Sequence, residues 1–169
     1  MRFVEAIADG VYRMVVMTTY AAGLRVSEVT HLRVGDIDSA RMLIHVREGK
    51  GRKDRLVPLS PVLLDLLRSY WRVHRPKGWL FPGQSDDKPL SPNTVQRAVA
   101  KARSVVGKHV TPHTLRHCFA THLLEAGINI RTVQGLLGHA KLETTSIYNH
   151  VARPELKPVK SPLDLILLS

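Results

Sequence analysis

The residues best suited to chemistry are His113 and Arg116, three positions apart in the segment His113-Thr114-Leu115-Arg116. On a helix, residues at this spacing share one face and lie about 5–6 Å apart. The guanidinium of an arginine can bind two oxygens of a phosphate at once. The spacing therefore indicates a phosphate-binding site near the start of a predicted helix.

Other residues that fit such a site come from separate parts of the chain. Arg25 stands just after a glycine at the junction of two predicted helices, where Glu28 is a possible partner. Lys50 lies between two glycines in a predicted hairpin tip. His139 follows a glycine at a predicted helix end, and Tyr148 lies nine residues beyond it. Cations gathered around a tyrosine hydroxyl suit nucleophilic attack on a phosphodiester.

The same residues could instead have purely structural roles or form another kind of site. His113 could cap its own helix, Arg25 could form an internal ion pair, and Tyr148 could be a half-buried aromatic. A zinc site would use His113, His117 and His122, but the sequence has no His-Glu-x-x-His motif and no cysteine pair.

Two further alternatives are a metal-dependent nuclease and a nucleotide-binding loop. A nuclease needs paired carboxylates, and acidic residues are scarce in this chain. The candidates are Asp36, Asp38, Asp86 and Asp87. The glycines around Lys50 lack the G-x-x-x-x-G-K-[ST] pattern of a phosphate-binding loop.

The elements that must position these residues are mostly helical. Apolar residues at helical spacing predict helices over residues 2–22, 27–32, 61–74, 92–106, 112–126, 130–137 and 142–150. A hydroxyl residue before a proline is typical of a helix start. Such pairs are Ser60-Pro61, Ser91-Pro92, Thr111-Pro112 and Ser161-Pro162. Residues 42–46 and 55–59 are predicted to form a β-hairpin, which makes the fold class mainly α with a small antiparallel β-sheet (α+β).

Composition narrows the class of protein. The chain has 169 residues, enough for one domain, with 44% hydrophobic residues and a single cysteine, Cys118. One cysteine excludes an intrachain disulfide framework, and no apolar run approaches the length of a membrane span. We therefore expect a cytoplasmic protein.

The basic charge is concentrated in two blocks. The net charge is +11; residues 41–55 hold six basic and two acidic residues, and residues 97–117 hold five basic residues and no acidic one. Such blocks indicate a phosphate-contacting surface and double-stranded DNA as the partner. The candidate DNA-binding residues are Arg52, Lys53, Arg97, Lys101 and Arg103. The predicted helix over residues 92–106 is the candidate DNA-facing element.

Several separated motifs together resemble one family. They are AGLRVSE at residues 22–28, GKGRKDRLVPL at 49–59, HTLRHCFATHLLEAGINIRTVQGLLGH at 113–139, and TTSIYNHV ending at residue 151. In this order and at these intervals they resemble the catalytic domain of tyrosine site-specific recombinases, the phage integrase family that includes Xer proteins and integron integrases. The resemblance covers roughly residues 5–152 and implies the catalytic-domain fold of that family.

The resemblance also implies a reaction, site-specific recombination or integration of DNA. A tyrosine, here Tyr148, attacks a DNA phosphate, forms a 3′-phosphotyrosyl bond and releases a 5′-hydroxyl. A 5′-hydroxyl of a partner strand then reverses the step, so that strands are exchanged without a metal or a cofactor. The resemblance further implies a tetramer of protomers on the DNA.

The other site residues take their roles from the same resemblance. Arg25 and Arg116 hold the non-bridging phosphate oxygens. Lys50 is the general acid for the leaving 5′-oxygen, with Lys53 as the alternative in the same connector. His113 assists as acid or base. The sixth catalytic position, His139, donates a hydrogen bond to the phosphate.

Two other functions stay open at this point. One is relaxation of DNA by the same chemistry, as in type IB topoisomerases, without exchange between partners. The other is a DNA-binding remnant that no longer cleaves, although every expected active-site position is filled.

The domain organisation follows from the position of the motifs. We expect a catalytic domain over residues 1–152 and a tail over residues 153–169, whose apolar end packs either in cis or onto a neighbouring protomer. The amino-terminal DNA-grasping domain of the family is expected to be absent. Binding to DNA should then be weak, poorly selective and steeply dependent on salt.

Overall fold

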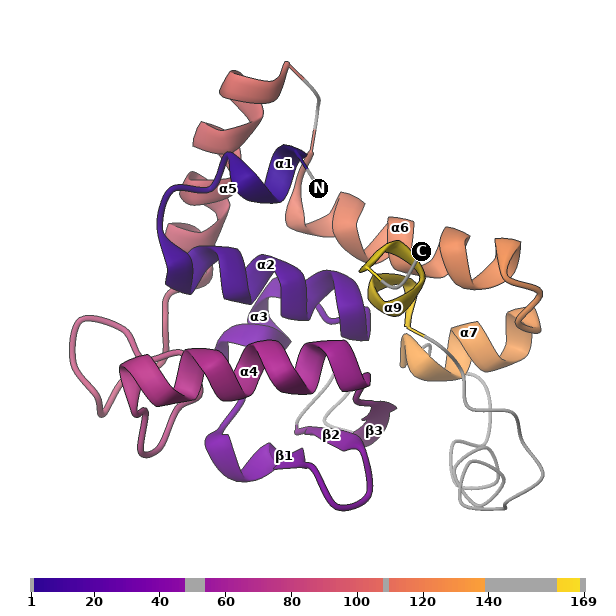
Figure 1. Ribbon diagram of the computed structural model, residues 1–169, viewed down its shortest axis with the longest axis horizontal. Coiled ribbons are helices and arrows are strands. Elements are labelled where there is room, and N and C mark those ends of the chain that lie inside the picture. Colours follow the sequence, from indigo (N-terminus) through magenta and orange to yellow (C-terminus); the bar gives the residue numbers. More distant parts are fainter. Residues whose placement is uncertain (1, 48–53, 108–109, 139–160, 168–169) are drawn as a thin grey trace.

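The computed structural model describes residues 2–47, 54–107, 110–138 and 161–167 (Figure 1). The elements, in chain order, are α1 (Arg2–Glu5), α2 (Gly10–Ala22), α3 (Val26–Thr30), the 3₁₀ turn η1 (Val34–Asp36), β1 (Ile37–Asp38), β2 (Leu43–Val46), β3 (Arg55–Pro58), α4 (Pro61–His74), α5 (Pro92–Val106), α6 (Pro112–Glu125), α7 (Ile130–Leu136) and α9 (Pro162–Leu167). Among these described helices, none is long and apolar enough to cross a membrane. The predicted class, mainly helical with a small antiparallel sheet, is confirmed.

The first helix differs from its prediction. The helix is interrupted between α1 and α2, so the prediction of one continuous helix over residues 2–22 is wrong. Asp9 caps α2, because its Oδ1 accepts from the backbone N–H of Val11 at 2.7 Å. A side chain that satisfies an orphan N–H group favours a new helix start over continuation. The predicted end is confirmed: Gly23 closes α2 in the left-handed region, with φ of 62°.

The sheet has three antiparallel strands in the order β1-β2-β3. The predicted hairpin is confirmed by the pairing of Ile44 with Val57 and of Val46 with Arg55. Its tip, with the predicted site residues Lys50, Arg52 and Lys53, lies outside the described residues. β1 was not predicted, because two residues are too short to show an alternating pattern.

The predicted helix starts are confirmed, but their caps differ. α4 and α5 span the predicted residues, and α6 ends one residue early. Ser60 accepts from the N–H of Leu63, and Thr111 accepts from the N–H of Thr114, each at 3.1 Å. Ser91 makes no such side-chain bond at the start of α5. The predicted helix over residues 142–150 lies outside the described residues.

The buried apolar residues that the structure describes form two clusters of unequal size. Figure 1 shows α2 and α4 side by side, with the strands beyond α4 and with α6 and α7 next to each other. The larger cluster joins α2, α3, α4, α5 and the sheet around side chains such as Leu24, Leu63 and Phe81. The smaller cluster lies between α6 and α7. Its buried members are Phe119, Leu123, Val133, Leu136 and Leu137.

The described part of the tail packs in cis. α9, the yellow helix in Figure 1, lies against α2, α4 and α6. The Ser161 hydroxyl donates to the carbonyl of Ala21 at 2.8 Å, and Leu163 is buried in the larger cluster. The structure holds a single chain, so the alternative of packing onto a neighbouring protomer stays a prediction.

Candidate active site

A pocket of about 510 Å³ lies where α3, α5 and α6 meet. Its lining includes Arg25, Gln96, Arg103, His113 and Arg116. Three of the six predicted catalytic residues are thus brought together from positions far apart in the sequence. The other three, Lys50, His139 and Tyr148, lie outside the described residues.

Arg25 stands immediately before α3 and is held by the first turn of that helix. Its Nη1 donates to Glu28 Oε1 and its backbone N–H donates to Glu28 Oε2, both at 2.7 Å. The predicted partnership of Arg25 with Glu28 is therefore confirmed. The Arg25 side chain remains 28% exposed and lines the pocket, while its backbone is held by Glu28.

Arg116 is more deeply buried, with 7% of its side chain exposed. Its Nη1 donates to the carbonyl of Gly23 at 2.7 Å, and its Nη2 donates to the carbonyl of Leu137. Burial, and then the charge of Arg25, lowers the pKa of Arg116 to about 10, while Glu28 acts in the opposite direction. Arg116 therefore stays positively charged at neutral pH, as an anion site requires.

Glu28 lies at the centre of the arginines. Burial alone would raise its pKa, but hydrogen bonds and charge from Arg55, together with hydrogen bonds from Arg25, lower this pKa to about 2. Arg116 Nη1 approaches Glu28 Oε2 at 3.6 Å. Three guanidinium groups thus surround one carboxylate, which leaves the group with a net positive charge beside the pocket.

Arg55 is the member of this group that the sequence interpretation did not single out. It is 5% exposed and donates from Nη1 and Nη2 to Glu28 Oε1 and Oε2, both at 2.8 Å. The signal was available in the strand pattern, since Arg55 alternates with Leu56 and shares a face with the apolar Val57. A charged residue on an inward face requires a buried partner.

The basic residues of α5 divide between the pocket that His113 lines and an outer surface. His113 is exposed in the first turn of α6, where it lines the pocket opposite α5. Arg103 also lines the pocket. Arg97 and Lys101 are exposed one turn apart on α5, outside the pocket lining. The five predicted DNA-binding residues therefore divide into Arg103 in the pocket, two on an outer surface, and two outside the described residues.

The competing metal sites are not assembled in the part of the chain that the structure describes. No group of three or more His, Cys, Asp or Glu side chains there could hold a metal ion. His122, a member of the alternative zinc set, instead pairs through Nδ1 with the Tyr20 hydroxyl at 2.7 Å.

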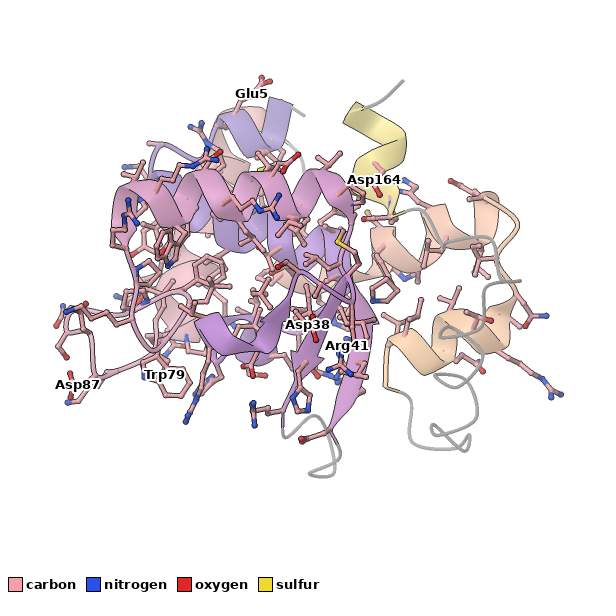
Figure 2. The ribbon with its side chains drawn as sticks, turned by 60° about the horizontal axis from the view of Figure 1, so that its bottom comes forward. Glu5, Asp38, Arg41, Trp79, Asp87 and Asp164 are labelled. Carbon is pink, nitrogen blue, oxygen red and sulfur yellow. The ribbon has the colours of Figure 1, made fainter. Side chains whose placement is uncertain are left out.

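The aspartates of the alternative nuclease site are also dispersed. Asp36 Oδ1 accepts from Arg47 Nε at 2.6 Å. Figure 2 shows Asp38 beside Arg41, whose Nε donates to it at 2.6 Å. The same figure shows Asp87 in the loop between α4 and α5.

Comparison of the sequence with known proteins gives consistent matches. The sequence pattern of the phage integrase family matches residues 1–155. The putative integrase/recombinase y4qK of Sinorhizobium fredii is 49% identical over 97% of this chain and 54% of its own length. Tyrosine recombinase XerA of Pyrococcus horikoshii is 40% identical over 96% of this chain and 59% of its own length. The chain thus spans little more than half the length of these relatives.

Solved structures show the same fold. The crystal structure of XerA recombinase superposes with a TM-score of 0.70 at 35% identity, over 88% of this chain and 55% of that chain. The pre-cleavage complex of XerH recombinase bound to its difH substrate gives a TM-score of 0.69 at 28% identity, over 88% of this chain and 47% of that chain.

Proposed function

The chain belongs to the phage integrase family, and from that premise we propose that it is the catalytic domain of a tyrosine site-specific recombinase. It would cleave and rejoin double-stranded DNA through a 3′-phosphotyrosyl intermediate. The observation that carries this proposal is the pocket in which Arg25, His113 and Arg116 meet beside one buried carboxylate. Acting on DNA, it would work in the bacterial cytoplasm at the nucleoid.

The arginines are suited to the phosphate of the DNA backbone. Bonds from Arg116 to described residues use two of the five N–H groups of a guanidinium. Glu28 holds the Arg25 guanidinium through a hydrogen bond, and the Arg25 side chain still lines the pocket. Negative charge on the phosphate oxygens grows in the transition state, so cations that are already in place lower the barrier.

The reaction itself follows the roles given by the family. The Tyr148 hydroxyl gives its proton to His113, acting as the base, and its oxygen bonds to the phosphorus, while the bond from phosphorus to the 5′-oxygen breaks. Lys50 gives a proton to that leaving oxygen, so the products are a phosphotyrosyl ester and a free 5′-hydroxyl. His113 assists proton transfer and His139 donates to a phosphate oxygen. Attack by another 5′-hydroxyl reverses the step and releases Tyr148.

The remaining basic residues are assigned to the DNA duplex around the cleaved phosphate. Arg97 and Lys101 present an exposed basic surface on α5, and Arg103 lies at the pocket itself. Contacts of this kind supply affinity that falls as salt rises. XerH, a relative in structure, is bound to its difH substrate in this fold. Assembly of four protomers on the DNA is part of the same proposal.

Covalent trapping tests this function directly. The chain is incubated with a pool of nicked duplexes that contain randomised sequence, so that a cleaved strand loses the short end needed for rejoining. A denaturing gel then separates any protein–DNA adduct from free protein. Tyr148→Phe is the variant, and Tyr12→Phe, in α2, is the matched control.

We expect an adduct with the parent chain and with Tyr12→Phe, and none with Tyr148→Phe. An adduct that survives Tyr148→Phe would show that another nucleophile reacts. Absence of any adduct, both for the chain and for the chain fused to the amino-terminal DNA-binding domain of a relative, would refute the assignment.

A further inference from the structure

We propose that Arg55 is a positioning residue for the phosphate-binding arginines: it fixes Glu28, and through Glu28 it sets the guanidinium of Arg25, while it anchors the same turn that Arg116 binds. This inference rests on the proposed function and concerns the same site. Arg55 does not line the pocket, so it acts through its neighbours and does not contact substrate.

The carboxylate of Glu28 is shared between two arginines in a defined way. Oε1 accepts from Nη1 of Arg25 at 2.7 Å and from Nη1 of Arg55 at 2.8 Å. Oε2 accepts from the Arg25 backbone at 2.7 Å and from Nη2 of Arg55 at 2.8 Å. The planar fork of Arg55 thus sets the plane of the carboxylate, and that plane determines where Arg25 Nη1 lies.

The third bond of Arg55 reaches the end of α7. Its Nε donates to the carbonyl of Leu136 at 3.1 Å, and Arg116 Nη2 donates to the next carbonyl, that of Leu137. The last carbonyls of a helix lack partners within it and are favoured by a nearby cation. Two arginines therefore hold consecutive carbonyls of one turn, one from β3 and one from α6.

The backbone at this turn is shaped to accept the Arg55 side chain. Gly138 has φ of +67°, and a Cβ there would lie 3.1 Å from Arg55 Cδ and 3.2 Å from Nε. The absence of a side chain at Gly138 lets the arginine stem lie directly on the chain. Arg55 consequently links β3, α3 and the end of α7 in one residue.

Stability alone does not explain this arrangement. A buried ion pair is often no more stabilising than apolar residues of similar size, because both charges lose their hydration. An apolar residue on β3 would fill the same volume but would leave Glu28 without the two hydrogen bonds from Arg55. Lysine would keep the charge but cannot make two parallel bonds to Glu28 and a third to Leu136. Geometry therefore requires arginine at this position.

The test uses the whole chain and compares three main substitutions. Arg55→Lys keeps the charge, and Arg55→Met keeps an apolar side chain of similar length. The matched control is Arg13→Lys, because Arg13 is a half-buried arginine that donates twice to the carbonyl of Ile7, away from the pocket. Thermal melting of all variants establishes that each is folded.

The first readout is the rate of adduct formation at saturating duplex. We expect Arg55→Lys and Arg55→Met to lower this rate about 10- to 100-fold, as a small misplacement of a binding group does. The duplex concentration for half-saturation should change less than about 3-fold, since surface cations supply most of the affinity. In a variant that also carries Glu28→Gln, Arg55→Lys should add no further loss, because both act on the same step.

The second readout does not depend on cleavage. Inorganic phosphate is titrated while the Nε–Hε signals of Arg25 and Arg116 are followed by NMR, with assignments from Arg25→Lys and Arg116→Lys. We expect both signals to shift with phosphate in the parent chain and in Arg13→Lys. In Arg55→Lys the Arg25 signal should move before phosphate is added, and phosphate should bind more weakly.

The outcomes separate the two proposals. Parent-like rates, phosphate affinity and Arg25 signals in folded Arg55→Lys would overturn the positioning role while leaving the function intact. A loss in Arg13→Lys equal to that in Arg55→Lys would also overturn it, because general destabilisation would then explain both. If neither the parent chain nor its fusion to the amino-terminal DNA-binding domain of a relative forms an adduct, but the phosphate site depends on Arg55, the recombinase assignment fails and the positioning role stands.

Discussion

The two apolar clusters in the described part of the protein differ in size and in how many elements they join. The larger one, around α2, α4 and the sheet, contains side chains from most elements of the chain. The smaller one, between α6 and α7, is confined to those two helices and the turn that follows them. A cluster of that size buries too little apolar area to be stable by itself. The smaller region therefore depends on its attachment to the larger one.

That attachment combines the packing of α6 against α2 with polar bonds from arginines in and beside the candidate active site. Arg116 of α6 donates to the carbonyl of Gly23 at the end of α2, and Arg55 of β3 donates to the carbonyl of Leu136 in α7. Glu28 lies between the two arginines. The comparison teaches that Arg116, which is expected to bind phosphate, and the two residues beside it, Arg55 and Glu28, also link the two regions.

The largest effect should follow from removal of the central carboxylate. Glu28→Ala leaves three arginines close together without their common partner, so we expect a loss of about 3–5 kcal/mol in the free energy of unfolding, measured by urea denaturation. Hydrogen exchange should show that α6 and α7 lose protection before α2 and α4. Equal loss of protection in all four helices would contradict the proposal that the smaller region depends on the larger one. Asp65→Ala, which removes an exposed pair with Arg68, should leave unfolding unchanged within error.

Acid should weaken the same attachment. The pKa of Glu28 is about 2 in the folded chain against 4.5 without the surrounding structure. A depressed pKa means that the contribution to stability is complete above about pH 4.5 and is lost as the pH falls toward 2. The total is roughly 3 kcal/mol.

Unfolding measured between pH 5 and 2.5 checks this effect. Glu28→Gln should flatten the dependence of stability on pH in that window. Asp38→Asn should flatten it less: hydrogen bonds from the backbone and side chain of Arg41 also lower the pKa of Asp38, but solvent screens this pair at the surface. A parent-like slope in Glu28→Gln would mean that other carboxylates control acid unfolding.

A smaller loss should follow when α2 and α6 are forced apart without a change of charge. Gly23 has φ of +62°, and a Cβ there would lie 2.4 Å from Phe119 Cδ1. Gly23→Ala thus adds overpacking to backbone strain, at about 2–4 kcal/mol. Gly107→Ala is the matched control, with φ of +70° and no described atom within 4 Å of the added carbon. Gly107→Ala should lower the free energy of unfolding only by the backbone strain, about 1–2 kcal/mol. Equal losses in the two variants would show that the Phe119 ring moves aside without a measurable loss of stability.

Sequence reasoning predicted the fold well where a signal is local. Helix starts followed from hydroxyl–proline pairs, and the pairing of Arg25 with Glu28 followed from their spacing and position. The break before α2 was missed, because apolar spacing continues through it and the cap at Asp9 decides the outcome.

The site was predicted less completely, for a physical reason. The types of residue that bind phosphate are readable in the sequence, and three of them meet in the pocket. Arg55 was not recognised, because its role depends on Glu28 and Leu136, which are distant in the sequence. No local pattern reveals which buried charges will meet. Equally, hydroxyl–proline pairs that look alike do not reveal which hydroxyl forms a cap.

The smallest effect is expected from the difference between the caps of α5 and α6. Thr111 caps α6, the helix that carries Arg116, whereas Ser91 starts α5 without a side-chain cap. Thr111→Ala should therefore cost about 1 kcal/mol in urea denaturation, and Ser91→Ala less than about 0.5 kcal/mol. Because α6 joins the two regions, Thr111→Ala should also weaken phosphate binding slightly. A Ser91→Ala loss as large as that of Thr111→Ala would show that the α5 hydroxyl caps its helix in solution.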